Sequence, residues 1–289
     1  MRELRHLDEV VSATGGDDLL LWTAQRLPGG GARAWACGDA VVVACPAVSK
    51  HDRLAVWGEP AGLAPLVRQA WREMGSGYRP FGDREVVHRL VEQMPAELGP
   101  AGNFTWMTVD PGTARLEGSA GDRSEIHSEI HSEIRSEFHA TADASGSGRG
   151  SHRSPSVLVE PAVRWLAPGA QTEVAGVLAV ANPDAYARPG MPGVTRWAGI
   201  RDDHGRLVTV GADAWSAPTV GFIGGVATLP QARGSGLAGA ICRFLTATLL
   251  DRHGRVSLMV DDLNTAALAV YRRLGYTRRP VAATRIQDA

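Results

Sequence analysis

The chain has 289 residues, 44% of them hydrophobic, and a formal net charge of -1. This length allows two small domains or one large one, and the nearly balanced charge argues against a dedicated nucleic-acid binder. No apolar run approaches a membrane span, and the charged N-terminal stretch MRELRHLDEV does not resemble a signal peptide. We therefore expect a cytoplasmic globular protein that binds neither nucleic acid nor membrane.

The cysteines predict neither a disulfide framework nor a metal site. Cys37, Cys45 and Cys242 are odd in number and lack the spacing of metal ligands. We expect them to be buried thiols in a reducing cytoplasm. No metal cofactor is predicted.

Residues 1–117 are expected to form an α/β domain of their own. Apolar runs at 32–37 and 40–45 flank Gly38-Asp39 and predict a β-hairpin. The other elements expected here are strands at 54–57 and 104–109 and helices at 63–74 and 83–94. This part contains no glycine loop leading into a clear helix, so we predict no phosphate site in it.

Residues 118–154 differ from both flanking parts. A four-residue repeat rich in Ser, Glu, Ile and His runs from Arg123 to His139, and a Ser/Gly-rich stretch follows. We interpret it as a dispensable low-complexity linker. A solvated repeat is favoured over a metal site built from its histidines.

The second domain is expected to occupy residues 155–289. It is predicted to begin with an extended segment at 157–166, a helix at 171–181 and a loop at 183–193 rich in Pro and Gly. Strands at 197–201 and 207–212 should form a hairpin that pairs antiparallel with a strand at 222–229. A helical crossover should then place a strand at 256–260 parallel to the strand at 222–229.

Residues 220–240, VGFIGGVATLPQARGSGLAGA, predict a strand, a short loop and the glycine-rich start of a helix. Pro230 should end the strand, and Gly254 suits the C-terminal cap of the helix. A helix N-terminus presents free N–H groups and the positive end of the helix dipole. The stretch therefore predicts a phosphate-binding site.

One interpretation of this site is a dinucleotide fold, because Gly234, Gly236 and Gly239 match G-x-G-x-x-G and Asp261 ends the next strand. However, residues 229–233 separate the strand from the first glycine, whereas the dinucleotide turn follows its strand directly. Only a short tail follows Asp261 to supply further βα units. A dinucleotide-dependent oxidoreductase stays the less favoured alternative.

The loop also resembles motif A of the GNAT (GCN5-related N-acetyltransferase) superfamily, with Gln231, Gly234 and Gly236 as Q-x-x-G-x-G. Downstream, Asn264, Tyr271 and the run Leu-Gly-Tyr at 274–276 look like the segment that ends a GNAT domain. The resemblance implies an α/β (α+β) fold with a mixed, mainly antiparallel sheet, flanking helices and two tandem GNAT-like domains. The chain resembles the bacterial two-domain type, which implies a degenerate N-terminal domain.

The same resemblance implies transfer of an acetyl group from acetyl-CoA to a small-molecule or peptide amine, by direct attack on the thioester and without a metal. It implies cofactor contacts from Val226, Ala227, Thr228, Gln231, Arg233, Gly234, Ser235, Gly236, Leu237, Ala238 and Asn264. If Asn264 caps the last helix, Tyr271 lies on the same helix face. Tyr271 is then the expected proton donor to the leaving thiolate.

Several points stay open at this stage. Asp213, Glu173, Asp202 and Asp261 are general-base candidates by residue type alone. The loop at 183–193 is either a substrate-contacting loop or an ordinary surface loop. A non-catalytic acyl-CoA-binding or sensing module is the main alternative to an enzyme. The acceptor and the oligomeric state are undetermined.

Overall fold

The computed structural model describes residues 1–116 and 162–287. Residues 1–115 and 162–287 belong to one compact unit. The expected linker at 118–154, with its histidine repeat, lies outside the described residues, as does the start of the segment expected at 157–166.

The N-terminal half, up to residue 116, alternates helices and strands, most of them where the sequence predicts them. Its elements are β1 (Arg2–Leu4), α1 (Leu7–Thr14), α2 (Asp18–Thr23), β2 (Arg33–Cys37), β3 (Ala40–Val48), β4 (His51–Trp57), α3 (Pro60–Met74), β5 (Arg79–Asp83), α4 (Arg84–Gln93) and β6 (Gly102–Val109). The expected hairpin is β2–β3. The sequence analysis missed β1, α1, α2 and β5.

The C-terminal half, from residue 162, follows the prediction closely. Its elements are β7 (Arg164–Trp165), α6 (Gln171–Ala181), β8 (Val194–Arg201), β9 (Leu207–Ala214), β10 (Gly221–Thr228), α7 (Leu237–His253), β11 (Val256–Val260), α8 (Thr265–Arg273) and β12 (Thr277–Ala283), with short 3-10 turns at Pro168–Ala170 and Pro230–Ala232. The helix α7 ends at Gly254 in the left-handed conformation, as expected of a glycine C-cap. The strand β12 was not predicted.

The strands form one mixed sheet in the order β1-β2-β3-β4-β5-β12-β6-β11-β10-β9-β8-β7. Neighbouring strands in this sheet are antiparallel, except for the parallel pairs β4–β5 and β10–β11. Each parallel pair is joined by a crossover helix, α3 in the N-terminal half and α7 in the C-terminal half. The predicted fold class, a mixed and mainly antiparallel sheet with flanking helices, is confirmed.

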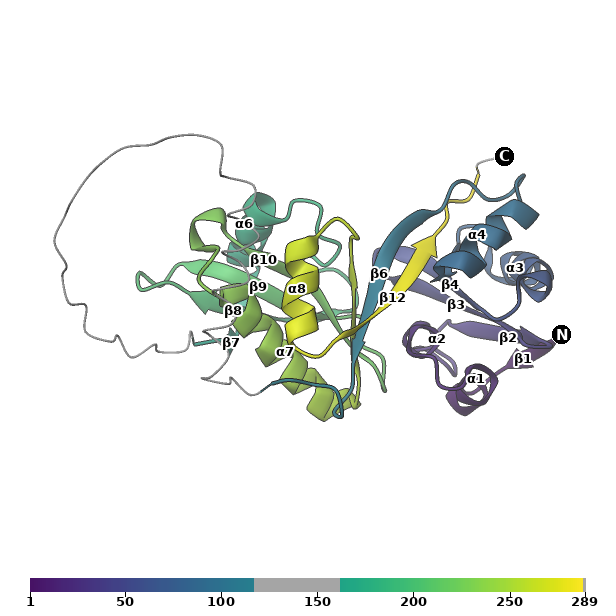
Figure 1. Ribbon diagram of the computed structural model, residues 1–289, viewed down its shortest axis with the longest axis horizontal. Coiled ribbons are helices and arrows are strands. Elements are labelled where there is room, and N and C mark those ends of the chain that lie inside the picture. The colour runs from purple at the N-terminus through teal and green to yellow at the C-terminus, as the bar shows by residue number, and fades with distance from the viewer. Residues whose placement is uncertain (117–161, 288–289) are drawn as a thin grey trace, which may run out of the picture. The chain divides into compact units, whose positions relative to one another are not determined.

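The two halves exchange their last strands. The strand β6, which ends the N-terminal half, pairs with β11, and β12, which ends the C-terminal half, pairs with β5. These two strands also pair with each other and lie side by side between the halves (Figure 1). A boundary near residue 117 therefore does not separate two independent sheets, because each half contributes a strand to the sheet of the other.

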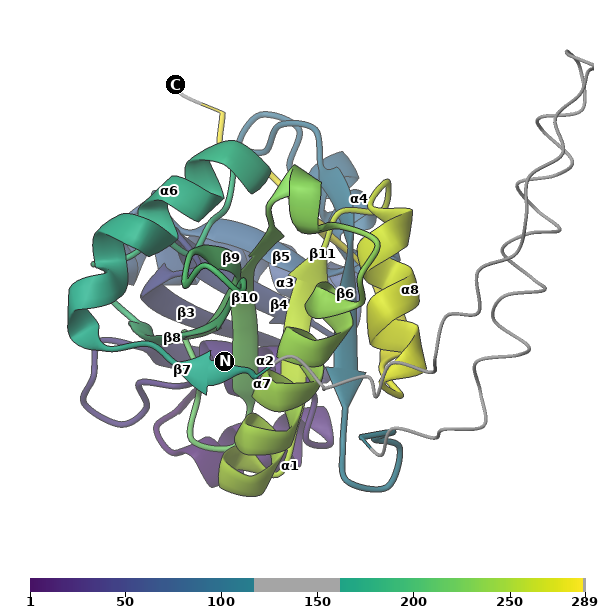
Figure 2. The ribbon, with the colours of Figure 1, turned by 90° about the vertical axis from the view of Figure 1, so that its left-hand side faces the viewer.

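A shared aromatic core joins the halves on one face of the sheet. Trp22 of α2 stacks on Phe222 of β10 with ring centroids 4.6 Å apart, and it also contacts Trp106 of β6. Its indole Nε1 donates to the carbonyl of Trp215 over 2.8 Å. Figure 2 shows α7 crossing in front of β10 and β11, with α6 and α8 on either side.

The connection from α8 into β12 requires a glycine. Gly275 has φ +93°, and a Cβ built there would lie 1.9 Å from the carbonyl oxygen of Thr113, which follows β6. Gly254 has φ +74° with nothing near its Cβ position. The two glycines share the backbone strain but only one has the steric conflict.

We expect Gly275→Ala to lower the free energy of unfolding more than Gly254→Ala does. Gly254→Ala should cost about 1–2 kcal/mol, the penalty for a left-handed residue with a Cβ. Gly275→Ala should cost at least about 1 kcal/mol more, because the backbone of Thr113 must also move. Urea denaturation of both variants measures the difference, and equal costs would contradict the close packing at this exchange point.

Candidate functional site

The parallel strands β10 and β11 open away from each other. They pair only at Gly221 with Val256 and at Phe222 with Ser257. On its other side, β10 continues along β9 to Thr228, with a bulge between Gly224 and Ala227. The end of β10 therefore has backbone groups that face away from β9 and are not paired with β11.

The corresponding pair in the N-terminal half is closed. Strands β4 and β5 pair from Arg53 with Arg79 through Val56 with Gly82. A Cβ at Gly82 would lie 2.4 Å from the carbonyl oxygen of Val56, so these strands approach closely. Two pairs with the same topology thus differ in whether a ligand can enter between them.

The open pair leads into the predicted glycine loop. After a 3-10 turn, Gly234 and Gly236 adopt φ +80° and +79°, a conformation that favours glycine. Gly236 is the N-cap of α7 and supplies no side chain to the first-turn N–H groups. These groups and the helix dipole form an anion-binding end.

The matching helix α3 lacks this arrangement. It begins with Pro60, which has no N–H, and its N-cap is Glu59, whose carboxylate would repel a phosphate. The start of α7 thus has free N–H groups and no acidic side chain at its N-cap, whereas the start of α3 has a proline and a glutamate.

Two side chains of the loop form hydrogen bonds that stabilise the loop conformation. Arg233 donates from Nε to the carbonyl of Thr228 over 3.1 Å and from Nη2 to the carbonyl of Ala181. Ser235 donates to the carbonyl of Ala232 over 2.7 Å. Here Arg233 ties the loop to β10 and α6, a role that the sequence analysis did not foresee.

The backbone segment Val226, Ala227 and Thr228 lies at the open end of β10. Ala227 is opposite Val210 on β9, and the carbonyl of Val226 accepts a hydrogen bond from the Asn182 side chain over 3.4 Å. Asn182 was predicted only as the end of a helix. Its part in holding β10 depends on a long-range contact that no local pattern indicates.

The last helix is positioned as the resemblance implies. Asn264 caps α8, since its Oδ1 accepts from the N–H of Ala267 over 3.0 Å. Tyr271 is buried and its ring lies against that of Tyr276. Both tyrosines pack beside α7, where the Tyr276 hydroxyl is 2.9 Å from the hydroxyl of Thr246.

Tyr271 is held in its neutral form. Burial, followed by the charge that the neighbouring Cys242 would carry as a thiolate, raises the pKa of Tyr271 well above its ordinary value. Burial also raises the pKa of Cys242 to about 12. At neutral pH the tyrosine hydroxyl therefore keeps its proton.

The four carboxylates considered as bases all have structural partners. The buried Asp213 pairs with Arg196 and accepts from Ser216, and the exposed Glu173 pairs with Arg201. The other two, Asp202 and Asp261, accept N–H bonds within their own turns. These contacts single out none of the four carboxylates as the general base.

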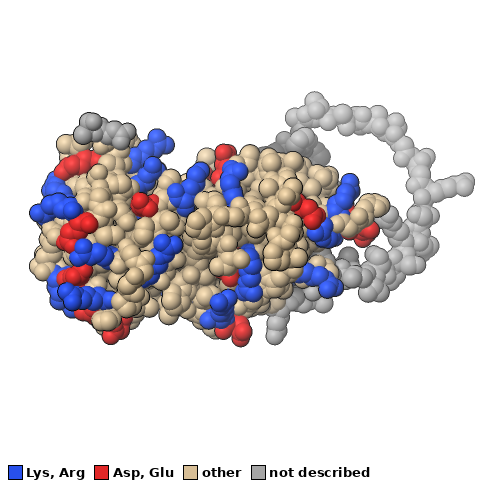
Figure 3. All heavy atoms as spheres, turned by 180° about the vertical axis from the view of Figure 1, so that it is seen from behind, with Lys and Arg blue, Asp and Glu red and all other residues tan. Residues whose placement is uncertain are grey.

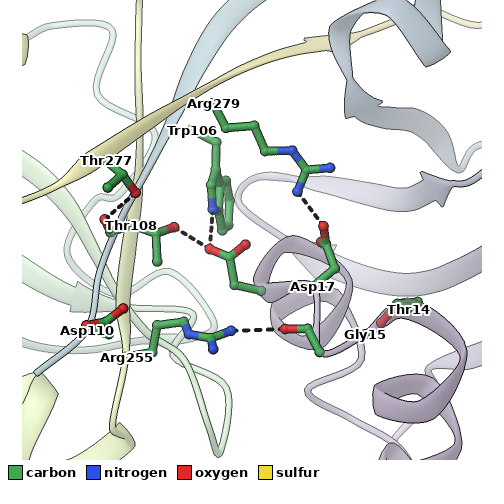
Figure 4. A pocket seen from close by; sticks show the side chains of 11 residues that line it. Thr14, Gly15, Asp17, Trp106, Thr108, Asp110, Arg255, Thr277 and Arg279 are labelled. Atoms are coloured by element: carbon green, nitrogen blue, oxygen red, sulfur yellow. Dashed lines mark hydrogen bonds and ion pairs between the residues drawn. The ribbon is translucent and has the colours of Figure 1, made fainter. Parts of the chain in front are cut away.

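A polar cavity of about 390 Å³ lies at the other end of the strands (Figure 4). It lies between α2 and the exchanged strands, and its charged groups are engaged. Asp17 pairs with Arg279, Arg255 donates to the carbonyl of Gly16, and Asp18 accepts from Trp106. Because α7 has 17 residues, its C-terminal end near Arg255 is roughly 25 Å from the glycine loop. This cavity belongs to the joint between the halves rather than to the loop.

Two sequence comparisons match parts of the chain. A family model described as FR47-like protein matches residues 199–286. The mycothiol acetyltransferase of Salinispora arenicola (strain CNS-205) is 45% identical over 64 residues, which is 22% of this chain and 21% of that relative. The matched segment thus spans about a fifth of the curated relative.

Solved structures share the fold over nearly the whole chain. A GCN5-related N-acetyltransferase from Kribbella flavida matches 97% of this chain and 95% of its own, with a TM-score of 0.55 and 17% identity. A GCN5-related N-acetyltransferase-like protein from Streptococcus suis 89/1591 matches 97% and 98%, with a TM-score of 0.52 and 14% identity. At these identities the structural likeness concerns the fold alone, and the family-model match lies in the C-terminal half.

Within residues 1–116 and 162–287, no helix is long and apolar enough to cross a membrane. In the same residues, no group of three or more His, Cys, Asp or Glu side chains could hold a metal ion. On the face shown in Figure 3, basic and acidic side chains are interspersed.

We expect the capping of α8 to depend on the side-chain oxygen of Asn264 and not on its amide nitrogen. Asn264→Ala should lower the free energy of unfolding by about 1 kcal/mol, because the first turn of α8 loses its cap. Asn264→Asp keeps the accepting oxygen and should restore most of that stability, but it removes the amide donor. Thermal denaturation of the three proteins checks this order, and an Asp variant as unstable as the Ala variant would contradict the capping role.

Proposed function

We propose that this protein is a member of the GNAT superfamily and an acetyl-CoA-dependent N-acetyltransferase that acts on a small-molecule or peptide amine. The observation that carries the proposal is the open β10–β11 pair ending in the uncapped glycine N-terminus of α7. A narrow opening between strands suits an extended pantetheine arm, and the helix N-terminus suits its pyrophosphate. The family match covers this part of the chain.

The chain's own groups can be assigned roles on this basis. First-turn N–H groups of Leu237 and Ala238, with the loop Gly234–Gly236, bind phosphate oxygens, while Gln231 and Ser235 border them. Backbone groups of residues 226–228 hold the pantetheine amides and face the thioester. Acetyl-CoA supplies the activated acetyl group. A neutral amine attacks its carbonyl, and the developing charge requires a donor and then a proton for the thiolate.

Tyr271 is the proposed proton donor. It comes from α8, beside the second turn of α7, and its hydroxyl is neutral. Asn264 at the start of α8 is the proposed amide contact to the pantetheine. No carboxylate is proposed as base, because the four candidates are engaged elsewhere; loss of the amine proton to water suffices chemically.

The two alternatives fit less well. A dinucleotide fold requires parallel strands and a turn directly after the first strand, whereas β9, β6 and β12 are antiparallel to their neighbours and a 3-10 turn follows β10. A non-catalytic acyl-CoA-binding module shares the whole site. It differs only in the absence of turnover.

We expect a negative charge at the first turn of α7 to abolish tight binding of acetyl-CoA. Gly239 has open space at its Cβ position and no positive φ, so Gly239→Glu can be accommodated. An acidic side chain there stabilises the helix but repels pyrophosphate. Gly239→Gln is the neutral control of the same shape. Calorimetric titration should give a dissociation constant at least about tenfold weaker for Glu than for Gln. Equal constants would place the phosphates elsewhere.

We expect Tyr271→Phe to slow acetyl transfer by about 100-fold, the lower range for loss of an acid catalyst, with little change in the KM for acetyl-CoA. Tyr276→Phe is the matched control, because it removes a buried hydroxyl from the same cluster. It should cost about 1 kcal/mol of stability and leave kcat nearly unchanged. Thiol release from acetyl-CoA with a panel of amines measures both. Equal kcat values in the two variants would make Tyr271 a packing residue.

A further inference from the structure

A group of basic side chains in the N-terminal half faces the loop at 183–193 of the C-terminal half. Lys50 and His51 lie at the β3–β4 turn, and Arg53 and Arg79 are opposite each other on β4 and β5. We call these four residues the basic cluster. The cluster contacts Tyr186: its ring lies 6.1 Å from the His51 ring and 5.6 Å from the Lys50 ammonium.

Arg53 is a buried cation that has no carboxylate partner among residues 1–116 and 162–287. The residue is 4% exposed, and its guanidinium lies over the Phe81 ring at 5.3 Å. Its Nε atom has no hydrogen-bond partner, and neither has the buried hydroxyl of Ser49 beside it. One bond, from Nη2 to the carbonyl of Ser49 over 3.5 Å, holds the group in place. Buried charges and donors in proteins are normally satisfied, so this group calls for an anion.

Within the described residues, no Asp or Glu forms an ion pair with Lys50, Arg53 or Arg79. The adjacent Asp52 is exposed, and its carboxylate accepts the N–H of Ala47. Burial and the neighbouring cations lower the pKa of His51 to about 4, so the imidazole is neutral at pH 7. Burial first, and then Arg79, lower the pKa of Arg53 to about 10, although Tyr186 opposes this shift. In both shifts the neighbouring cations add to the larger effect of burial.

The turn that carries the cluster is strained. Ala47, Ser49 and Lys50 all have positive φ although none is glycine. Such strain is concentrated at functional sites, where the surrounding structure maintains it. It accompanies the bulge between Cys45 and Val48, which directs the turn toward Tyr186.

The cluster lies next to the strand that we assign to the thioester. Ala187, directly after Tyr186, packs on β10 at its bulge: its Cβ is 3.2 Å from a Cβ position at Gly224 and 3.3 Å from one at Gly225. The proposed thioester contacts begin at the next residue, Val226. A ligand that bridges Tyr186 therefore extends from the basic cluster toward the acetyl group.

We propose that the basic cluster binds an anionic group, a carboxylate or phosphate, of the amine that accepts the acetyl group. Arg53 and Arg79 provide the guanidinium donors, Lys50 closes the outer side, and Tyr186 forms the wall between this subsite and β10. The identity of the ligand as an acyl acceptor rests on the proposed function. The anion subsite itself does not.

The first test measures anion binding without any transfer. Inorganic phosphate and acetate are titrated calorimetrically into the Gly239→Glu protein, whose glycine loop no longer competes for phosphate. We expect Arg53→Met in this background to weaken binding by at least about tenfold, as for loss of a charged hydrogen bond. Arg72→Met, on the exposed side of α3, should have no effect. Lys50→Gln and Arg79→Gln, at accessible positions, should each weaken binding even if Arg53→Met fails to fold.

The second test compares acceptors in pairs that differ only in the anion: glucosamine 6-phosphate with glucosamine, and alanine with alaninamide. We expect the charged member of one pair to have a KM at least about tenfold lower, and Arg79→Gln to remove that preference with kcat within about threefold. The pair that responds distinguishes phosphate from carboxylate. Transfer without any preference for the charged amine overturns the subsite.

The two proposals fail separately. If no amine is acetylated but Arg53→Met and Arg79→Gln still abolish anion binding, the acyltransferase proposal falls and the anion subsite stands. If the anions bind equally to the Gly239→Glu protein and to these variants in the same background, the subsite falls whatever the transfer assay shows.

Discussion

The architecture depends on the exchange of strands β6 and β12 between the two halves. Each of these strands pairs with a strand of the opposite half. The two strands also pair with each other, from Gly102 with Ala283 to Thr108 with Thr277. Neither half can satisfy the backbone groups of its last parallel strand alone, because β5 needs β12 and β11 needs β6. The halves therefore fold as one unit, and the aromatic core around Trp22 lies across their junction.

The two halves share a topology of two parallel strands joined by a helix, but one strand pair is closed and the other is open. In the N-terminal half, β4 and β5 stay paired, α3 starts with Pro60, and Glu59 occupies its N-cap. In the C-terminal half, β10 leaves β11 after two pairs, and glycines lead into α7. The same strand-helix-strand topology thus gives one open and one closed strand pair, and the two helices also differ in the residues at their N-termini.

The sequence predicts the C-terminal half well because its signals are local. Pro230 after an apolar run, Gly254 after a helical run and Asn264 before one each fix an element by backbone chemistry alone. The sequence does not predict the exchange, since Thr277–Ala283 contains three polar or charged residues and a proline, and its partners are far away in the chain. The sequence also does not predict the hydrogen bonds that Arg233 and Asn182 donate within the fold. Their partners are backbone carbonyl groups, which every residue has, so the sequence pattern does not indicate them.

The N-terminal half has no opening between β4 and β5, yet its sheet carries an uncompensated charge on the face shared with the C-terminal half. A half with a purely structural role would gain stability by replacing Arg53 with an apolar residue, because a buried cation without a partner is costly. It would also relieve the strained turn at Ala47, Ser49 and Lys50 with glycines. Both features lie against Tyr186, one residue from the contact of Ala187 with the β10 bulge. These residues therefore lie near the strand that we propose to contact the thioester, and the proposed anion subsite would give the closed half a role in choosing the acceptor.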